Sequence, residues 1–306
     1  MKTVLKFFVW LFAVTALLVG IVYFIYPGLI IGAIQSLSAS GAGLTKRSVD
    51  IDGYTAYFYE GGDASKPTLM LLHGLTDDKN SFVTSVRGLT ASYHVLLPDL
   101  QAHGENKKGN DRDYSIAGQA AFINRLCNKL NISQVVIGGN SMGGHTSAAF
   151  AANYPDKTRG LIVLNATGMQ LDNESVYTYF PDKIDVAFLQ TFFDTAFVTP
   201  PAYPKPVLQY RVNQMNANIP FINDLIRQVE RGADFRMNEK AQSITVPSLV
   251  LWGKQDPIVP LAYADSYNEN LANAKMVAFD NAGHSPQFEI PERIGLELKS
   301  FMQSLD

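Results

Sequence analysis

A single serine, Ser141, is surrounded by glycine in the segment VVIGGNSMGGHTSAAF. The segment begins as an apolar, β-branched strand and continues as an Ala-rich helix, so Ser141 stands at their junction. At a sharp strand-to-helix turn, the G-x-S-x-G pattern of GNSMG strains the serine backbone and lifts its hydroxyl above the sheet. A side chain at Gly139 or Gly143 would collide with the turned backbone. Ser141 is therefore the candidate nucleophile; the alternative is a plain glycine turn with a solvent-facing serine.

A serine nucleophile needs a base, and the base needs an acid to orient it. The segment LVLWGKQDPIVP ends a predicted strand and places Asp256 in the next loop, and FDNAGHSPQFEIPE does the same for His284. Both loops lie at the carboxyl edge of the predicted sheet, where Ser141 also lies and where open α/β sheets bind ligands. We predict that His284 accepts the serine proton and that Asp256 fixes the imidazole tautomer.

The other histidines are predicted to be structural. His73 belongs to a strand-ending HG turn, His94 begins a strand, His103 lies in a loop, and His145 faces outward or packs on the serine's helix. None of them follows the order serine, acid, histidine along the chain.

A tetrahedral oxyanion needs two backbone N–H donors. One is expected from Met142, next to the nucleophile, and the other from Leu75 in the loop HGLTDDKNSF. The sequence has no H-E-x-x-H, no paired His/Cys set and no G-x-x-x-x-G-K. We therefore expect no metal and no cofactor.

Alternating strand-like and helix-like segments must position these residues. Buried apolar runs alternate with helical patterns, which indicates βαβ units and a mostly parallel sheet flanked by helices, an α/β fold. The predicted strands are 46–52 and 55–62 (an edge hairpin), 67–74, 94–100, 134–139, 160–166, 247–253 and 275–280. The predicted helices of this core are 81–93, 115–131, 142–153 and 291–305.

The region 168–244 has a different character and is predicted to be a helical cap inserted into the core. It is rich in aromatics and proline, and amphipathic patterns occur at 188–197 and 221–229. Its aromatics are expected to form mainly the cap's own core. The predicted divisions are therefore 1–45 (anchor and linker), 46–167 with 245–306 (core), and 168–244 (cap).

An apolar run from Phe7 to Tyr26 predicts an N-terminal transmembrane helix, because about 20 helical residues span a bilayer. A cleaved signal peptide is the alternative, but the run is long and no Ala-x-Ala site follows closely. Lys2 and Lys6 lie nearer to the run than Lys46, which favours a cytoplasmic N-terminus and a catalytic domain on the non-cytoplasmic side of a single-pass anchor.

Composition excludes several other classes of function. The 25 basic and 28 acidic residues of the 306-residue chain nearly cancel, so there is no charge argument for nucleic acid. The single cysteine, Cys127, rules out an internal disulfide. Nothing in the sequence fixes the oligomeric state.

The segments LLHGLTDDKNSF, GNSMGG, LWGKQDPIVP and AGHSPQFEIPE resemble the α/β-hydrolase superfamily, and more narrowly the membrane-anchored monoacylglycerol lipases and related bacterial lipases. The resemblance runs from about Lys46 to the C-terminus and is thin across the cap. It implies an α/β-hydrolase fold and ester hydrolysis with Ser141, Asp256 and His284 as the triad. Gln101 and Ala102 replace the Pro-Gly that relatives usually carry before His-Gly.

The expected function is that of a serine hydrolase acting on acyl-lipid esters, with monoacylglycerol as the first-choice substrate and the bilayer as partner. Two alternatives are a general carboxylesterase and a C–C bond hydrolase of ring-cleavage products. The C–C hydrolases usually have Trp after the catalytic histidine, whereas this chain has Ser285. A non-catalytic binding module is a third alternative, although such modules usually lose a triad residue.

Overall fold

A twisted, mostly parallel sheet forms the centre of the molecule. The computed structural model describes residues 6, 8–10, 12, 14–15, 20, 24–109, 112–169, 171 and 176–305. Its 8 strands are ordered β1-β2-β4-β3-β5-β6-β7-β8, with β1 and β2 antiparallel to their neighbours and the other pairs parallel. The strands are β1 (Leu44–Ile51), β2 (Tyr54–Gly61), β3 (Thr68–Leu72), β4 (His94–Pro98), β5 (Val135–Asn140), β6 (Thr158–Leu164), β7 (Ser248–Gly253) and β8 (Ala274–Phe279). The predicted α/β fold is confirmed.

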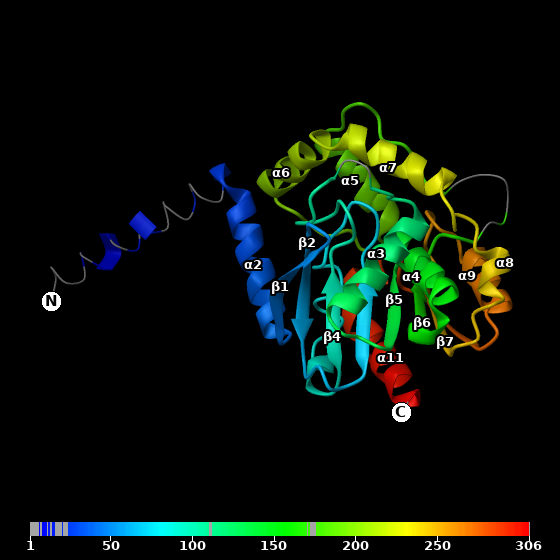
Figure 1. Cartoon of the computed structure of the whole chain (residues 1–306). Coiled ribbons are helices and arrows are strands. Elements are labelled where there is room, and N and C mark those ends of the chain that lie inside the picture. Colours follow the sequence, from blue (N-terminus) through cyan, green and yellow to red (C-terminus); the bar gives the residue numbers. More distant parts are fainter. Residues whose placement is uncertain are drawn as a thin grey trace.

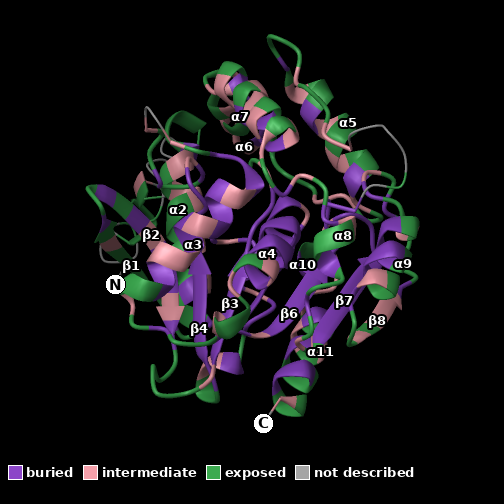
Figure 2. Ribbon diagram, turned by 45° about the vertical axis from the view of Figure 1, so that its right-hand side comes forward, coloured by how far each residue is buried: buried purple, intermediate pink, exposed green. Residues whose placement is uncertain are grey.

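Helices cover both faces of this sheet (Figure 1). Because side chains alternate along a strand, Met70 and Leu72 of β3 join one core cluster and Leu69 and Leu71 join the other. This double burial explains the continuous apolar runs of β3, β4, β5, β6 and β7, which are almost entirely buried (Figure 2). The helices of the first face are α3 (Ile116–Lys129), α4 (Met142–Asn153) and α9 (Leu261–Asn270), and the second face carries α11 (Pro291–Ser304).

The helix predicted over 81–93 does not form. Between β3 and β4 the chain makes successive turns, followed only by the short 3-10 helix η1 (Leu89–Ala91). Gly88 has φ 79°, a left-handed conformation that ends a right-handed helix. The apolar residues Phe82, Val83 and Val86 are nevertheless buried. Their spacing therefore reflects contact with the core rather than an α-helix.

The cap lies between β6 and β7 in sequence and above one end of the sheet in space (Figure 1). It contains α5 (Val186–Ala196), α6 (Lys205–Asn216) and α7 (Ile219–Arg231), and α8 (Asn238–Ala241) leads back to the core. α5 and α7 match the two predicted amphipathic patterns. α6 was not predicted, because it is mostly polar and buries only Leu208 and Val212. A small core of its own, centred on Ile184, Leu189 and Ile219, holds the cap together.

The N-terminal part contains a helix packed on the core. α2 (Pro27–Gly41) contacts β1 and the cap helix α6, and Gly28 lies so close to Tyr210 that a Cβ there would be 2.7 Å from the ring. Half of the predicted membrane span, 7–26, falls outside the described residues. Within the described part of the chain, no helix is both long and apolar enough to cross a bilayer.

Candidate active site

Ser141 occupies the sharp turn between β5 and α4. Its backbone has φ 55° and ψ −122°, a conformation that non-glycine residues rarely adopt. A Cβ on Gly139 would lie 2.3 Å from the carbonyl oxygen of Leu72, and a Cβ on Gly143 would lie 2.2 Å from the same atom. Both glycines therefore allow the turn to pack directly on the end of β3. This packing brings the strained serine to the carboxyl edge of the sheet.

Asp256 and His284 meet at the same edge, from the loops after β7 and β8. The Nδ1 of His284 lies 2.8 Å from Oδ2 of Asp256, and both residues are buried. The other carboxylate oxygen, Oδ1, accepts N–H groups from Ile258 at 2.8 Å and Val259 at 2.9 Å. These two bonds fix the carboxylate and leave Oδ2 aimed at the imidazole. The acid can therefore hold Nδ1–H in place and leave Nε2 as the proton acceptor.

The predicted oxyanion donors flank the serine. Met142 is the first residue of α4, where an N–H group has no acceptor within the helix. Leu75 follows Gly74, whose Cβ position is 3.4 Å from Cβ of Ser141, so this loop passes beside the nucleophile. Among the described residues, no hydrogen bond is donated by the N–H of Leu75. Both residues thus lie next to Ser141 in the chain or in space, and their role as oxyanion donors stays a prediction.

A buried ion pair fixes the loop that carries Leu75. The Nζ of Lys79 lies 2.8 Å from Asp99 and 2.8 Å from Glu105, and only 4% of the lysine side chain is exposed. Asp99 also accepts the backbone N–H of Lys79 at 2.8 Å. The loop is therefore attached to the end of β4 by charge-assisted hydrogen bonds.

The model of the alpha/beta hydrolase fold family matches residues 67–291, which is most of the chain. The chain belongs to the α/β-hydrolase fold family. Monoacylglycerol lipase ABHD6 of Bos taurus is 25% identical over 281 residues, covering 86% of this chain and 83% of the relative. Lipase 1 of Psychrobacter immobilis is 25% identical and covers 81% of each chain. This α/β hydrolase is therefore of the lipase and esterase type.

Solved structures agree with this assignment. The crystal structure of a membrane phospholipase A, described as a bacterial virulence factor, superimposes with a TM-score of 0.85 and 28% identity, covering 100% of this chain and 99% of that one. A meta-cleavage product hydrolase from Pseudomonas fluorescens IP01 has a TM-score of 0.74 at 18% identity, covering 85% of this chain and 98% of that one. The second likeness shows a common fold alone.

The sequence did not reveal Asn165, which follows β6 and connects the loops of Asp256 and His284. Its side-chain amide donates to Oδ2 of Asp256 at 2.7 Å and to the carbonyl of Gly283 at 3.2 Å. Its side-chain oxygen accepts the N–H of Gly253 at 3.0 Å. The sequence feature that could have indicated Asn165 was an amide side chain directly after a buried strand, at the sheet edge where the candidate catalytic residues lie. The side chain of Asn165 therefore links the carboxylate of Asp256 to the backbone of the histidine loop.

We expect Asn165→Ala to lower kcat about tenfold, because Asp256 loses a donor that orients it. The measurement is ester turnover, with thermal unfolding as the control for folding. Asn153→Ala provides a matched comparison: its amide donates to Asp234 at 2.6 Å, away from the triad. Equal losses in the two variants would contradict a role of Asn165 in orienting the acid.

Asn140, the residue before the nucleophile, was also missed. Its buried side-chain amide donates to the backbone carbonyl of His284 at 2.9 Å and to that of Leu164 at 3.2 Å. The turn that carries Ser141 is thereby hydrogen-bonded to the loop that carries the base. In the sequence, Asn140 stands at the first variable position of G-x-S-x-G, so the motif does not single it out.

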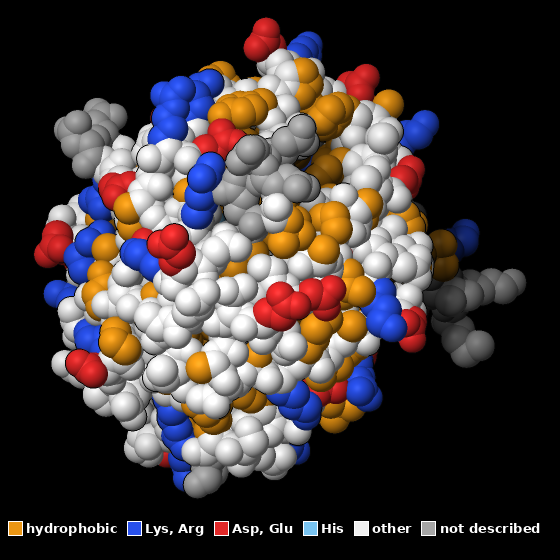
Figure 3. All heavy atoms as spheres, turned by 90° about the vertical axis from the view of Figure 1, so that its right-hand side faces the viewer, with side chains coloured by type: hydrophobic (Ala, Val, Ile, Leu, Met, Phe, Trp, Pro, Cys, Tyr) orange, Lys and Arg blue, Asp and Glu red, His pale blue; other side chains and the backbone are white. Residues whose placement is uncertain are grey.

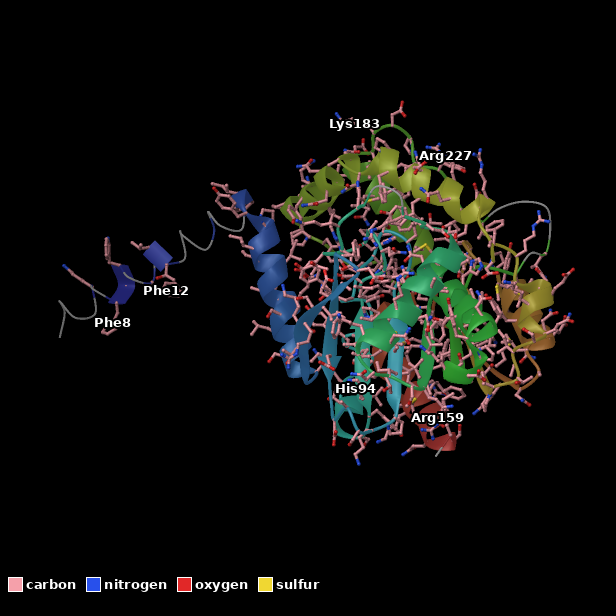
Figure 4. All side chains as sticks on the ribbon, in the orientation of Figure 1. Phe8, Phe12, His94, Arg159, Lys183 and Arg227 are labelled. Atoms are coloured by element: carbon pink, nitrogen blue, oxygen red, sulfur yellow. The ribbon has the colours of Figure 1, made fainter. Side chains whose placement is uncertain are left out.

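The other four histidines have structural partners. His94 bonds to Thr68 and Glu60, and Figure 4 shows it at the end of the molecule away from the cap residues Lys183 and Arg227. His73 accepts the N–H of Leu100 at 3.0 Å. His145 is fully buried and donates to the carbonyl of Asp234 at 2.7 Å. His103 donates to the carbonyl of Gln101 at 2.9 Å.

Two of these histidines make stability depend on pH. Burial lowers the pKa of His145 to about 4 and that of His103 to about 3, below the ordinary value of 6.5. The unfolded chain therefore binds more protons below pH 6.5, so stability is complete above that pH and falls as the pH drops toward 4. Each group contributes a slope of about 1.4 kcal/mol per pH unit.

We expect the free energy of unfolding, measured in urea, to fall between pH 6.5 and 4.5. Carboxylates also titrate in this range, so the matched variant is His145→Gln, whose amide can still donate toward Asp234. The variant should show a shallower pH dependence than the wild type. Identical slopes would rule out His145 as a source of the effect.

No group of three or more His, Cys, Asp or Glu side chains within the described ranges is arranged to hold a metal ion. The one cysteine, Cys127, is buried on α3, where burial raises the pKa of its thiol to about 12. It is therefore an apolar packing residue rather than a second nucleophile.

Proposed function

We propose that this α/β hydrolase cleaves carboxylic esters of acyl lipids through an acyl-enzyme on Ser141. The observation that carries the proposal is the 2.8 Å contact between His284 and Asp256, with the second oxygen of Asp256 already held by two backbone N–H groups. Such a pair orients a neutral imidazole as a base, and the strained serine lies at the same sheet edge. In this proposal Ser141 is the nucleophile, His284 is the base and Asp256 is the acid.

The reaction follows from these positions. His284 Nε2 takes the proton of Ser141 as its oxygen attacks the ester carbonyl, and the N–H groups of Leu75 and Met142 receive the oxyanion. His284 then protonates the departing alcohol. His284 then deprotonates a water molecule that attacks the acyl-enzyme, and it returns this proton to the oxygen of Ser141 as the fatty acid leaves. Asp256 stabilises the imidazolium in both halves of the reaction.

An acyl lipid is the substrate class that the cap supports. Hydrophobic side chains gather on the upper part of the face in Figure 3, where the cap lies, and several cap aromatics are exposed, among them Phe188, Phe192 and Tyr203. The curated relatives include monoacylglycerol lipases, so monoacylglycerol is the first substrate that we propose. A phospholipid is the second, because the phospholipase A structure covers the whole chain at 28% identity.

We also propose a membrane location. The apolar sequence 7–26 leads directly into α2, and exposed apolar side chains of α2, including Leu29, Ile34 and Leu37, continue it. Lys2 and Lys6 are the basic residues nearest to the apolar sequence 7–26. Their position favours a single-pass anchor with the catalytic domain on the non-cytoplasmic side. A general carboxylesterase and a C–C bond hydrolase are the alternatives to lipid hydrolysis.

The deciding experiment compares purified full-length protein on monoacylglycerols, phospholipids, triacylglycerols and short soluble esters, with Ser141→Ala as blank. A form lacking residues 1–25 keeps α2, whose Pro27 and Ala39 are buried, and it tests the anchor separately through binding to lipid vesicles. Preference for monoacylglycerol supports the first proposal, and preference for phospholipid supports the second. Turnover of short esters alone supports a general esterase. Absence of ester turnover would favour the C–C hydrolase.

A further inference from the structure

The side chain of Glu289 joins the histidine loop to the cap. Glu289 ends the short helix α10 (Pro286–Glu289), which follows His284. One carboxylate oxygen accepts the N–H of Gly283 at 2.7 Å, and the other accepts the N–H of Val198 at 2.8 Å. Gly283 directly precedes His284, and Val198 lies two residues beyond the end of α5. A single carboxylate therefore receives one hydrogen bond from each side.

The two segments also touch each other directly. The backbone N–H of His284 donates to the carbonyl of Ala196, the last residue of α5, at 2.8 Å. A Cβ on Gly283 would lie 2.5 Å from the same carbonyl oxygen. The end of α5 is thus in hydrogen-bonding contact with the backbone of the base. Any displacement of this end of the cap also displaces an acceptor of His284.

The core holds α10 independently of the cap. Gln287, which is buried, accepts the hydroxyl of Ser85 on its backbone carbonyl at 3.2 Å and donates its side-chain amide to Ser81 at 3.3 Å. Ser81 lies at the end of the loop that carries Leu75, Ser85 follows this loop, and both serines are buried. Glu289 is therefore carried by an element fixed to the core, while one of its two donors belongs to the cap.

We propose that Glu289 is a positioning residue that couples the seating of the cap to the placement of His284. When the end of α5 packs in this position, the N–H groups of Val198 and Gly283 both donate to the carboxylate of Glu289. The carbonyl of Ala196 then accepts the backbone N–H of His284. When the end of α5 leaves this seat, the histidine loop loses these partners and the imidazole shifts relative to Ser141. The proposal deepens the proposed ester hydrolysis and rests on it. If Glu289 only stabilised the fold, its replacement would change the stability of the protein and leave turnover by the folded enzyme unchanged.

The hydrogen bond that the cap donates to Glu289 can be removed by changing a single backbone N–H group. Val198→Pro deletes the N–H that Glu289 accepts, and Phe197, at φ −120° and ψ 140°, already has the conformation that a following proline requires. Val198→Ala keeps the N–H and is the matched control. The substrate is a short soluble ester, which needs few contacts with the cap. We expect Val198→Pro to lower kcat about 10- to 100-fold and Val198→Ala to stay near the wild type.

Glu289→Gln tests the other partner. An amide has one accepting oxygen, and its NH₂ would oppose one of the two N–H groups. We expect a similar loss of kcat, and the double variant Val198→Pro/Glu289→Gln should be no slower than Glu289→Gln alone, because both changes break the same bridge. Hydrogen exchange of the peptides covering 195–199 and 281–285 should rise together in each single variant, and thermal unfolding reports whether each variant folds.

Full kcat in folded Val198→Pro, or losses that multiply in the double variant, would overturn the coupling. Exchange that rises only in the cap peptide would overturn it as well. If Glu289→Gln does not fold, Val198→Pro and its alanine control still decide the question. Failure of the proposed function looks different, because wild-type protein would then turn over no ester, while the exchange of the two peptides would still show whether they are linked.

Discussion

Ser141→Ala is expected to lower ester turnover about 10⁵-fold or more, the largest effect of any single substitution in this chain. The change removes the hydroxyl that we propose forms the acyl-enzyme, while the proposed N–H donors of Leu75 and Met142 remain. The strained backbone at φ 55° is the same for alanine as for serine, so the variant should unfold near the wild-type temperature. The measurement is kcat on the preferred ester, with unfolding followed in parallel.

Ser147→Ala is the matched control for this variant. Ser147 also lies buried on α4, but its hydroxyl donates to the carbonyl of Gly143 at 2.8 Å and faces no predicted catalytic group. It should keep kcat within about threefold of the wild type while losing some stability, about 1 kcal/mol for one hydrogen bond. Substantial turnover by Ser141→Ala would show that another group is the nucleophile.

Asp256→Asn is expected to lower kcat about 10⁴-fold with the fold intact. The two backbone N–H groups of Ile258 and Val259 require an acceptor at Oδ1, so the new amide nitrogen must occupy the position of Oδ2. There it donates to Nδ1 of His284, which moves the imidazole proton to Nε2. The nitrogen facing Ser141 then cannot accept the serine proton. The same nitrogen also opposes the amide of Asn165, which adds local repulsion.

Asp280→Asn provides the control carboxylate. Asp280 lies four positions before His284 in sequence, but it is exposed and pairs with Lys254 at 2.7 Å. An exposed pair contributes little, so turnover should stay within about twofold. If both variants lost activity equally, or if Asp256→Asn kept normal kcat, the orienting acid would have to be another residue.

The order of the candidate catalytic groups along the chain was sufficient to predict that they lie at one edge of the sheet. Parallel strands end at one edge of a sheet, so residues that directly follow buried strands must meet there. Ser141, Asp256 and His284 each follow such a strand, and the structure brings the last two into contact. Local patterns also predicted the strands and the helices α3, α4, α5, α7 and α11, because burial of an apolar face leaves a period in the sequence.

The apolar periodicity along the chain predicted the wrong secondary structure in two places, because burial of apolar side chains did not coincide with helix formation there. The apolar spacing at 81–93 marks residues that face the core from successive turns, and Gly88 at φ 79° interrupts this segment with a left-handed conformation. α6 shows the converse, since a mostly polar helix forms where its neighbours cover only Leu208 and Val212. In both cases the surrounding structure, rather than the local pattern, decides the conformation.

Only the tertiary structure could reveal the hydrogen bonds that connect the loops of the predicted triad. Asn165 reaches Asp256 across 91 positions, and Asn140 reaches His284 across 144. Glu289 reaches Val198 across 91 positions. A single asparagine or glutamate has no local pattern, because its role depends on which backbone group the fold brings within hydrogen-bonding distance. The sequence by itself determined the candidate catalytic groups, through their order after buried strands, and the folded chain decided which side chains hold those groups in place.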